Sequence, residues 1–492
     1  MNTAPILILQ MQRMGDLVLS FPLLGWLGRL FPDHPLWVVG ERAFFEPLMP
    51  LSPKATYFSY GSEQQFSGIR FHSVINLSHR PEAAALASKV RSDSLFGSSL
   101  DSLGRLYING NWQLYRTSLT HNNRYNLYHW ADLNALDIIP ADTIRKTLWP
   151  PPRPFSKTIV GNAGARIGLF LGASEPDKRP DADFWAQLTR IFLDKGQKPV
   201  LLGGKAELPI GNAVAGMLKL PALNLCGRFD IKSLARFLSE LDLLVTPDTG
   251  PMHIASWAGT PVLNLSLGPV NPWETGPFSS GHHIVRADLE CTGCWRCICE
   301  RPFCRDMVRP ALVAKLAARL LAGQKTDARA FSLRGLELLR SGRDSHGLYT
   351  LESLNRGPMG ENNRQDCAET EETAEERAAL SRFWKAWFGC QFGIFTPEEE
   401  GDAWREFQEQ SPEAALGLKE SAAGLLRDLA RDFRSGAPKM LTEPDAWRHP
   451  RQALHPFSGY LQMYAQNTQD DEESRTAQLH ILSLAEQLAA LP

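Results

Sequence analysis

The stretch Leu243-Leu244-Val245-Thr246-Pro247-Asp248-Thr249-Gly250-Pro251-Met252-His253-Ile254-Ala255 joins a short apolar run to the start of a helix. A continuous apolar run is typical of a strand that is buried on both faces. Asp248 or Thr249 is a suitable N-cap, and Pro251 suits the first helical turn. The stretch therefore predicts a strand that leads directly into a helix, which is the unit of a parallel α/β sheet.

The same alternation of strand and helix surrounds this stretch. Apolar runs predict strands over 167–171, 199–204 and 262–265, and helical spacing predicts helices over 184–193 and 231–239. A second α/β half precedes it, with predicted strands over 6–9, 36–40 and 73–77 and a helix after Asp16. Five prolines between Pro140 and Pro154 predict a linker between the halves. We therefore expect two Rossmann-like α/β lobes with a cleft between them.

The last part of the chain differs in composition. Residues 361–492 carry 24 Asp and Glu but only 13 Lys and Arg. The other residues carry 30 Asp and Glu and 39 Lys and Arg, so the last part of the chain is acidic and the rest is basic. Leu418, Ala422, Leu425, Leu429 and Phe433 follow helical spacing, and leucines near the end predict a last helix. We expect lobes over 1–150 and 151–325, a linker over 326–365, and over 366–492 a separable α-helical appendage that serves either interaction with a protein partner or localisation.

Composition excludes several classes of protein. The moderately basic body suits an anionic substrate, but its charge is too dilute for a nucleic-acid binder. No apolar stretch approaches the ~20 residues that span a bilayer, and the start has no signal-peptide pattern. The first strand is followed by no Gly-x-Gly-x-x-Gly motif, and the chain has no Walker loop. We expect a cytoplasmic protein that is neither a dehydrogenase nor a P-loop enzyme.

Four features predict a site that binds a phosphorylated ligand and acts on a hydroxyl. The free N–H groups of the helix that begins near Gly250 form an anion seat, and Lys178 follows a strand in the same lobe and can reach phosphate oxygens. Glu207 can accept hydrogen bonds from ribose hydroxyls. Asp16 follows the first strand, where a carboxylate can take a proton from an attacking hydroxyl. Each residue also has a plain structural interpretation, because Asp16 and Thr249 suit helix caps and surface lysines and glutamates are common.

Five of the eight cysteines lie close together in the sequence, at Cys291, Cys294, Cys297, Cys299 and Cys304. Their spacing fits soft metal ligands such as those of zinc. A cluster of reduced thiols beside the cleft is the alternative interpretation, and a reducing compartment argues against disulfides.

Together these segments resemble glycosyltransferase family 9, the bacterial ADP-heptose:lipopolysaccharide heptosyltransferases, over roughly residues 5–322. The similarity rests on Ile6-Leu7-Ile8, Met14-Gly15-Asp16-Leu17-Val18, Phe21-Pro22-Leu23, Lys178 before Phe184-Trp185, Leu225-Cys226-Gly227, Asp248 to Ala255, Gly259-Thr260-Pro261-Val262, Gly268-Pro269, Thr275-Gly276-Pro277, and Cys291-x-x-Cys294-x4-Cys299-x4-Cys304.

The resemblance implies a GT-B fold and inverting transfer without a metal or other cofactor. It implies that Asp16 is the general base and that Glu207 meets the nucleoside. It further implies that the donor diphosphate is held by Ser174, Lys178, Thr249 and Gly250, with Asp248 and His253 in the same donor-site signature. The expected partners are ADP-heptose and a lipid-linked saccharide at the inner face of the cytoplasmic membrane.

One stretch departs from the family pattern. Heptosyltransferases that act on the first core sugar carry a sequence resembling Gln-Gly-x-x-Lys after the third strand, whereas this chain has Ser78-His79-Arg80-Pro81-Glu82. Arg80, Lys89 and Arg91 are the candidate replacements for the missing acceptor-binding lysine. Two other functions remain open: a regulator that binds nucleotide sugars without turnover, and a nucleotide-sugar epimerase of the same fold.

Overall fold

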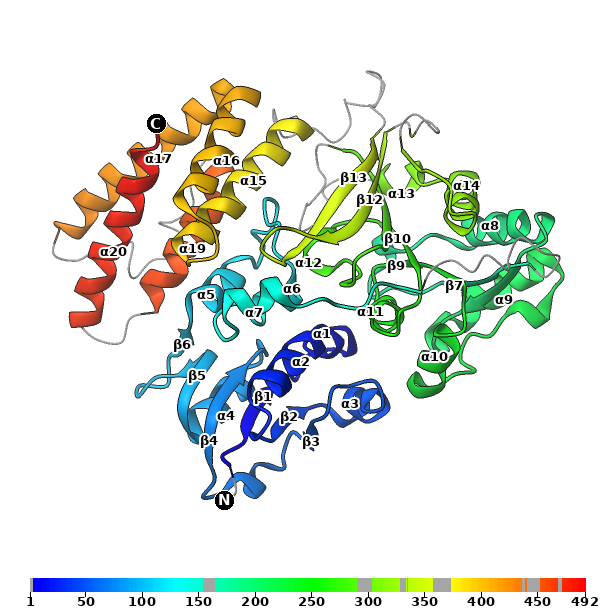
Figure 1. The fold of residues 1–492 in the computed structure, drawn as a ribbon, viewed down its shortest axis with the longest axis horizontal. Helices are drawn as coiled ribbons and strands as arrows, with labels where there is room; N and C mark the ends of the chain where they lie inside the picture. The colour runs from blue at the N-terminus through cyan, green and yellow to red at the C-terminus, as the bar shows by residue number, and fades with distance from the viewer. Residues whose placement is uncertain are drawn as a thin grey trace.

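The structure is a computed structural model that describes residues 3–153, 164–289, 303–327, 333, 335–356, 373–435, 439, 452–467 and 471–492. Two α/β lobes and a group of C-terminal helices make up these residues, and the helices lie beside both lobes (Figure 1). The predicted architecture, two α/β lobes of GT-B type with C-terminal helices, is confirmed.

The first lobe is a six-stranded sheet in the order β3-β2-β1-β4-β5-β6, parallel except for β6. Its strands are β1 (Ile6–Leu9), β2 (Leu36–Gly40), β3 (Thr56–Ser59), β4 (Arg70–Asn76), β5 (Arg91–Leu100) and β6 (Leu106–Asn109). Its helices are α1 (Met14–Leu19), α2 (Phe21–Leu30), α3 (Arg42–Leu48), η1 (Glu63–Phe66), α4 (Pro81–Lys89), α5 (Asn111–Ser118), α6 (Trp130–Leu133) and α7 (Ala141–Lys146). Every residue of β1 is fully buried, as its unbroken apolar sequence predicts.

The second lobe is a seven-stranded sheet in the order β13-β12-β11-β10-β9-β7-β8. Its strands are β7 (Arg166–Phe170), β8 (Lys198–Leu202), β9 (Leu243–Pro247), β10 (Val262–Ser266), β11 (His283–Ala287), β12 (Leu336–Arg343) and β13 (Tyr349–Arg356). Its helical segments are η3 (Pro176–Lys178), α8 (Ala182–Asp194), η4 (Lys205–Glu207), α9 (Leu208–Leu218), η5 (Pro221–Leu223), α10 (Ile231–Leu238), α11 (Gly250–Trp257), α12 (Pro272–Thr275), α13 (Phe303–Met307) and α14 (Pro310–Leu321). The strand and helix predicted around Gly250 are β9 and α11.

The range 326–365 is not simply a linker, contrary to our expectation. Strands β12 and β13 form an antiparallel hairpin, and β12 pairs with β11, so the hairpin extends the second sheet. Leu336, Leu338 and Leu339 of β12 are buried.

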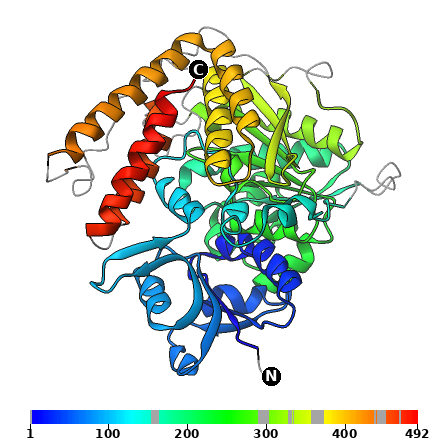
Figure 2. The same ribbon diagram turned by 60° about the vertical axis from the view of Figure 1, so that its left-hand side comes forward.

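The C-terminal helices are not a separate body. They are α15 (Ala374–Gln391), α16 (Pro397–Gln410), α17 (Pro412–Phe433), η8 (Gln452–Leu454), α19 (His455–Gln466) and α20 (Asp471–Ala489). α17 and α20 lie side by side at the edge of the molecule (Figure 2). The tyrosine hydroxyl of Tyr128 donates to the carbonyl of Lys385 at 2.6 Å, and the side chain of Asn467 bonds both backbone groups of Ile108 in β6.

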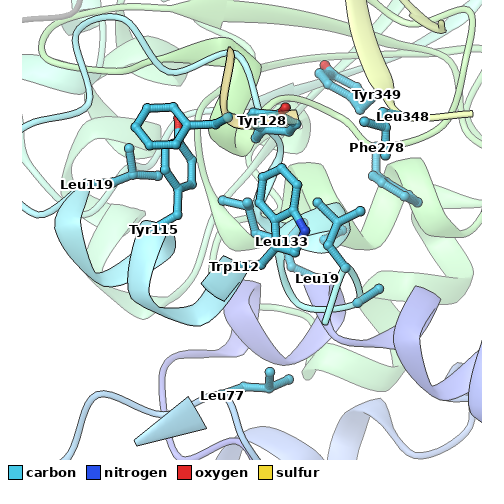
Figure 3. Packing of buried hydrophobic residues seen from close by; sticks show 14 of the residues in the cluster. Leu19, Leu77, Trp112, Tyr115, Leu119, Tyr128, Leu133, Phe278, Leu348 and Tyr349 are labelled. Atoms are coloured by element: carbon cyan, nitrogen blue, oxygen red, sulfur yellow. The ribbon is translucent and has the colours of Figure 1, made fainter. Parts of the chain in front are cut away.

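The contact between these helices and the first lobe is apolar as well. The ring centroids of Tyr115 and Phe388 are 4.5 Å apart, and those of Trp112 and Phe392 are 4.9 Å apart. Figure 3 shows Trp112, Tyr115 and Tyr128 of the first lobe gathered in this core. One hydrophobic cluster thus continues from the first lobe into the helices, which corrects the expectation of a separable appendage. Among the residues that the structure describes, no helix is both long and apolar enough to cross a membrane.

Candidate active site

The two lobes touch where β1 leads into α1 and β9 leads into α11. A Cβ atom added to Gly15 would lie 3.2 Å from Cδ2 of His253 and 3.6 Å from Cα of Gly250. A Cβ added to Gly250 would lie 2.9 Å from Cε of Met14. Because parallel strands of one sheet end at the same edge, this contact joins the carboxyl edges of both sheets, where ligands of such folds bind.

Asp16 lies in the first turn of α1, beside this contact. Arg13 occupies the N-cap position without a side-chain capping bond, so Asp16 is not the N-cap that we predicted. Burial raises the pKa of Asp16, while the positive charge of Arg116 opposes the rise. A carboxylate that is a stronger base than usual, on a rigid helix, is suited to proton transfer.

Asp248 lies directly after β9. Burial raises its pKa to about 6; the cation of Lys178 lowers it, and the negative charge of Asp16 raises it further. The hydroxyl of Thr275 donates to Asp248 at 3.2 Å. The loop that carries Lys178 packs beside the same edge, because a Cβ added to Gly268 after β10 would lie 2.8 Å from the carbonyl oxygen of Asp177. The structure thus brings Asp16, Lys178 and Asp248 together.

The start of α11 has the geometry that the sequence predicts. Thr249 is the N-cap residue in extended conformation, without a side-chain capping bond, and a proline occupies the first turn. The N–H groups of a first helical turn have no partner within the helix. His253, one turn further, is buried; burial lowers its pKa to about 4, and its Nδ1 atom has no hydrogen-bond partner.

Ser174 and Glu207 lie at the same edge of the second sheet, in the loops after β7 and β8. Ser174 is exposed. The carboxylate of Glu207 accepts a hydrogen bond from the backbone N–H of Gly204 at 2.8 Å. A Cβ added to Gly172 would lie 2.6 Å from Cδ of Glu207, so this glycine leaves the room that the carboxylate fills.

The acceptor-side candidates do not lie together. Arg80 precedes α4 at the carboxyl end of β4, and its guanidinium pairs with Glu41 at 2.6 Å. Lys89 ends α4, and Arg91 begins β5 in register with Arg70, the first residue of β4. Helix α4 runs back along the sheet, so Lys89 and Arg91 lie at the amino edge, away from Asp16. Only Arg80 remains an acceptor-side candidate.

The sequence analysis missed Arg116, the cation that faces Asp16. It is buried on α5, its Nη2 donates to the carbonyl of Leu77 at 2.9 Å, and its guanidinium lies 4.7 Å from the ring centre of Trp130. Burial lowers its pKa to about 10, and the charge of Asp16 raises it. One arginine on a helix gives no signal in a sequence, because most such residues are solvated.

A buried polar cluster behind Asp248 was missed as well. Glu274 on α12 accepts hydrogen bonds from the amides of Asn123 at 2.7 Å and Asn126 at 2.9 Å, which belong to the first lobe. Burial raises the pKa of Glu274 to about 7. Thr275, the next residue, bonds Asp248, so this cluster connects the first lobe to the candidate site.

Cys291, Cys294 and Cys299 lie outside the described residues, and Cys304 lies in α13. Among the residues that the structure describes, no group of three or more His, Cys, Asp or Glu side chains is placed to hold a metal ion. A metal site and a cluster of reduced thiols therefore both remain predictions for the cysteines.

This geometry defines a two-lobed α/β protein with its candidate site at the lobe contact. The sequence model of glycosyltransferase family 9 (heptosyltransferase) matches residues 155–302. The chain is therefore similar to glycosyltransferase family 9 over that region.

Relatives similar in sequence include named heptosyltransferases. Lipooligosaccharide heptosyltransferase 2 of Campylobacter jejuni is 29% identical over 170 residues, which cover 33% of this chain and 53% of that protein. Lipopolysaccharide heptosyltransferase 2 of Escherichia coli is 29% identical over 125 residues, 24% of this chain and 36% of that protein. The chain thus matches about half or less of these relatives. The structure of the E. coli ADP-heptose lps heptosyltransferase II aligns with a TM-score of 0.48 at 18% identity, over 65% of this chain and 99% of that one.

Proposed function

We propose that this protein is an inverting, metal-independent glycosyltransferase that moves a heptose from ADP-heptose to a hydroxyl of a lipopolysaccharide core or related glycan. The observation that carries the proposal is the contact of Gly15 with Gly250 and His253, which sets Asp16 of one lobe beside the α11 start of the other. The family match over residues 155–302 and the names of the similar proteins support the substrate classes.

In the proposed reaction, Asp16 accepts the proton of the acceptor hydroxyl while its oxygen attacks the anomeric carbon from the face opposite the diphosphate. The bond from that carbon to the diphosphate oxygen breaks, and ADP leaves with the electron pair. The configuration inverts because a single displacement takes place, and one carboxylate suffices because the acceptor is the nucleophile. General-base assistance of this kind contributes about 10²–10⁴-fold.

The second lobe stabilises the leaving group in this proposal. The diphosphate gains negative charge as the bond breaks, and groups that are already oriented toward that charge are worth most. Four residues take this role in the proposal: Ser174, Lys178, Thr249 and Gly250. The last two contribute backbone N–H groups, which bind anions at the start of a helix. Glu207 meets the nucleoside.

Asp248 and His253 support the donor site structurally and do not themselves contact the diphosphate in this proposal. With a pKa raised to about 6, Asp248 is paired with the hydroxyl of Thr275, and Lys178 stabilises its ionised form. Neutral His253 packs between the lobes with Nδ1 unpaired, which leaves one polar atom for a bound ligand or water. The acceptor, a lipid-linked saccharide, approaches from the first lobe near Arg80.

A donor screen tests the proposal. ADP-heptose, UDP-sugars and GDP-sugars are each incubated with the full chain, with and without a core-oligosaccharide acceptor and with a chelator, and nucleotide release and product configuration are measured. The proposal predicts acceptor-dependent ADP release from ADP-heptose that survives the chelator and inverts the anomer. Binding without turnover would instead favour a regulator, and a changed sugar nucleotide in the absence of acceptor would favour an epimerase.

A further inference from the structure

A cavity of about 350 Å³ lies outside the candidate active site, where three parts of the chain meet. Arg124 and Asn126 of the first lobe form one wall, and strands β11, β12 and β13 form the second. The first turns of α15 form the third. Figure 1 shows α15 beside β13. Most of the lining residues lie after residue 302, where the family match ends.

The cavity wall is rich in guanidinium groups. Among the lining residues are five arginines and a single carboxylate, Glu337; the arginines are Arg124, Arg286, Arg356, Arg377 and Arg382. Three further carboxylates pair with these arginines from outside the wall: Asp288 and Glu375 with Arg356, and Glu406 with Arg382. Three of the four carboxylates that pair with these arginines are thus not among the residues that line the cavity.

Several of these arginines are held in fixed positions. Arg286 pairs with Glu337 at 2.8 Å, with both side chains largely buried, and its guanidinium lies 4.7 Å from the ring centre of Trp273. Arg356 makes two bonds to Asp288, at 2.6 and 2.9 Å. Arg377 is only 6% exposed and donates to the carbonyl of Leu289. A planar guanidinium that is already oriented loses little entropy when it binds phosphate or carboxylate.

The other lining groups suit a polar organic ligand. Hydroxyls of Thr350, Ser353 and Ser381 line the cavity along with Asn126. The volume is at the lower end of the range for small-molecule sites, which begins near about 300 Å³. Hydroxyls and amides in such a site bind the neutral polar part of a ligand, and arginines bind its charge.

We propose that this cavity binds a small organic anion of the size of a phosphorylated monosaccharide, at a site separate from the candidate active site. The cavity also contacts α12 through Trp273, and the neighbouring Thr275 bonds Asp248. The ligand therefore lies one short helix away from the proposed donor seat. The inference does not depend on the proposed function, since it rests on the cavity alone.

Calorimetric titration of the full chain tests the proposal, with glucose 6-phosphate, glucose and inorganic phosphate as probes. Two variants probe the cavity: Arg382→Gln removes a charge whose side chain is 42% exposed, and Ala378→Leu fills space in the wall. Arg405→Gln is the matched control, because Arg405 is an exposed arginine of α16 outside the wall. Lys178→Ala reports on binding at the proposed donor seat.

We expect glucose 6-phosphate to bind the wild type more tightly than either glucose or phosphate. Arg382→Gln should weaken binding about tenfold, as the loss of one charged hydrogen bond does. Ala378→Leu should weaken it by a similar factor because the larger side chain occupies part of the cavity, while Arg405→Gln and Lys178→Ala should bind as the wild type does. Unchanged affinity in both cavity variants, or an equal loss in Lys178→Ala, would overturn the proposal. Equal affinity for inorganic phosphate would show a phosphate site and overturn the saccharide part.

Discussion

Gly15 and Gly250 face each other across the two lobes, so that a Cβ atom on either glycine would lie in van der Waals contact with the backbone of the other. The Cβ of an alanine at position 15 would lie 3.6 Å from Cα of Gly250, and one at position 250 would lie 3.6 Å from the backbone nitrogen of Gly15. Neither glycine has a positive φ, so close approach rather than backbone conformation explains them. This approach sets the distance between the proposed base and the proposed phosphate seat.

Gly250→Ala should lower the rate of transfer by about 10- to 100-fold, because a displacement of a few tenths of an ångström to 1 Å between reacting groups costs this much. The added Cβ would meet Cε of Met14 at 2.9 Å. Met14→Ala in the same chain should restore part of the rate. Gly216→Ala is the control, since a Cβ there meets nothing within 4 Å. Wild-type transfer by Gly250→Ala would mean that the lobes do not meet this way during the reaction.

Lys178→Ala should raise the donor KM and lower kcat, with a combined loss of about 2–4 kcal/mol in kcat/KM, because one charge-stabilising group is removed. The side chain is 19% exposed and its ammonium lies 3.7 Å from the carboxylate of Glu175. Lys205→Ala on η4 serves as a control at a nearby exposed lysine. Donor kinetics equal to the wild type would place the phosphate seat elsewhere.

Truncation after Arg356 should destabilise the chain severely rather than release a working enzyme. It would expose Trp112 and Tyr115, which pack against Phe392 and Phe388 of the C-terminal helices. Two large aromatic side chains bury enough surface to contribute several kcal/mol, at about 25 cal/mol per Å². Thermal unfolding and light scattering measure the effect. A soluble truncated chain with the melting temperature of the full chain would contradict the shared core.

The raised pKa of Glu274 should make the free energy of unfolding depend on pH. Its pKa is raised from 4.5 to about 7 in the folded protein, so the folded state holds more protons than the unfolded state between these values. Its contribution is therefore greatest at low pH and is lost as pH rises through about 7. Relative to Glu274→Gln, the wild type should lose about 1–3 kcal/mol of unfolding free energy between about pH 5 and about pH 8.

Denaturant unfolding of both proteins at several pH values measures this difference. Glu240→Gln is the control, because that carboxylate is half exposed and pairs with Arg166 on the surface. A constant difference between the wild type and Glu274→Gln across this range would show that Glu274 stays ionised when buried.

The sequence predicted those parts of the fold whose signals are local. The apolar run of β1 and the turn chemistry at Thr249 and Pro251 each act within a few residues, and both elements appear where they were expected. The position of Asp16 near the first helix was predicted, but its capping role was wrong, because Arg13 begins that helix. A capping pattern in the sequence does not fix the first residue of a helix to within three residues.

Features that depend on contacts between distant segments could not be predicted. Arg116 is recognisable only once α5 lies against β4 and Asp16, and Lys89 and Arg91 are excluded only once the direction of α4 is known. The β12–β13 hairpin and the docking of the C-terminal helices likewise follow from pairing and packing over long sequence separations. No spacing within one segment encodes such contacts.

The most direct test of the account is the rate of sugar transfer by Asp16→Asn, measured together with its donor affinity and stability. Asparagine preserves the shape of the side chain but cannot accept the proton of the acceptor hydroxyl, and Asp142→Asn, in the first turn of α7, controls for the loss of a helix-start charge. The account predicts that transfer falls about 10²–10⁴-fold, while donor affinity and unfolding free energy change little. Near-wild-type transfer by Asp16→Asn would contradict it, because the base would then lie elsewhere.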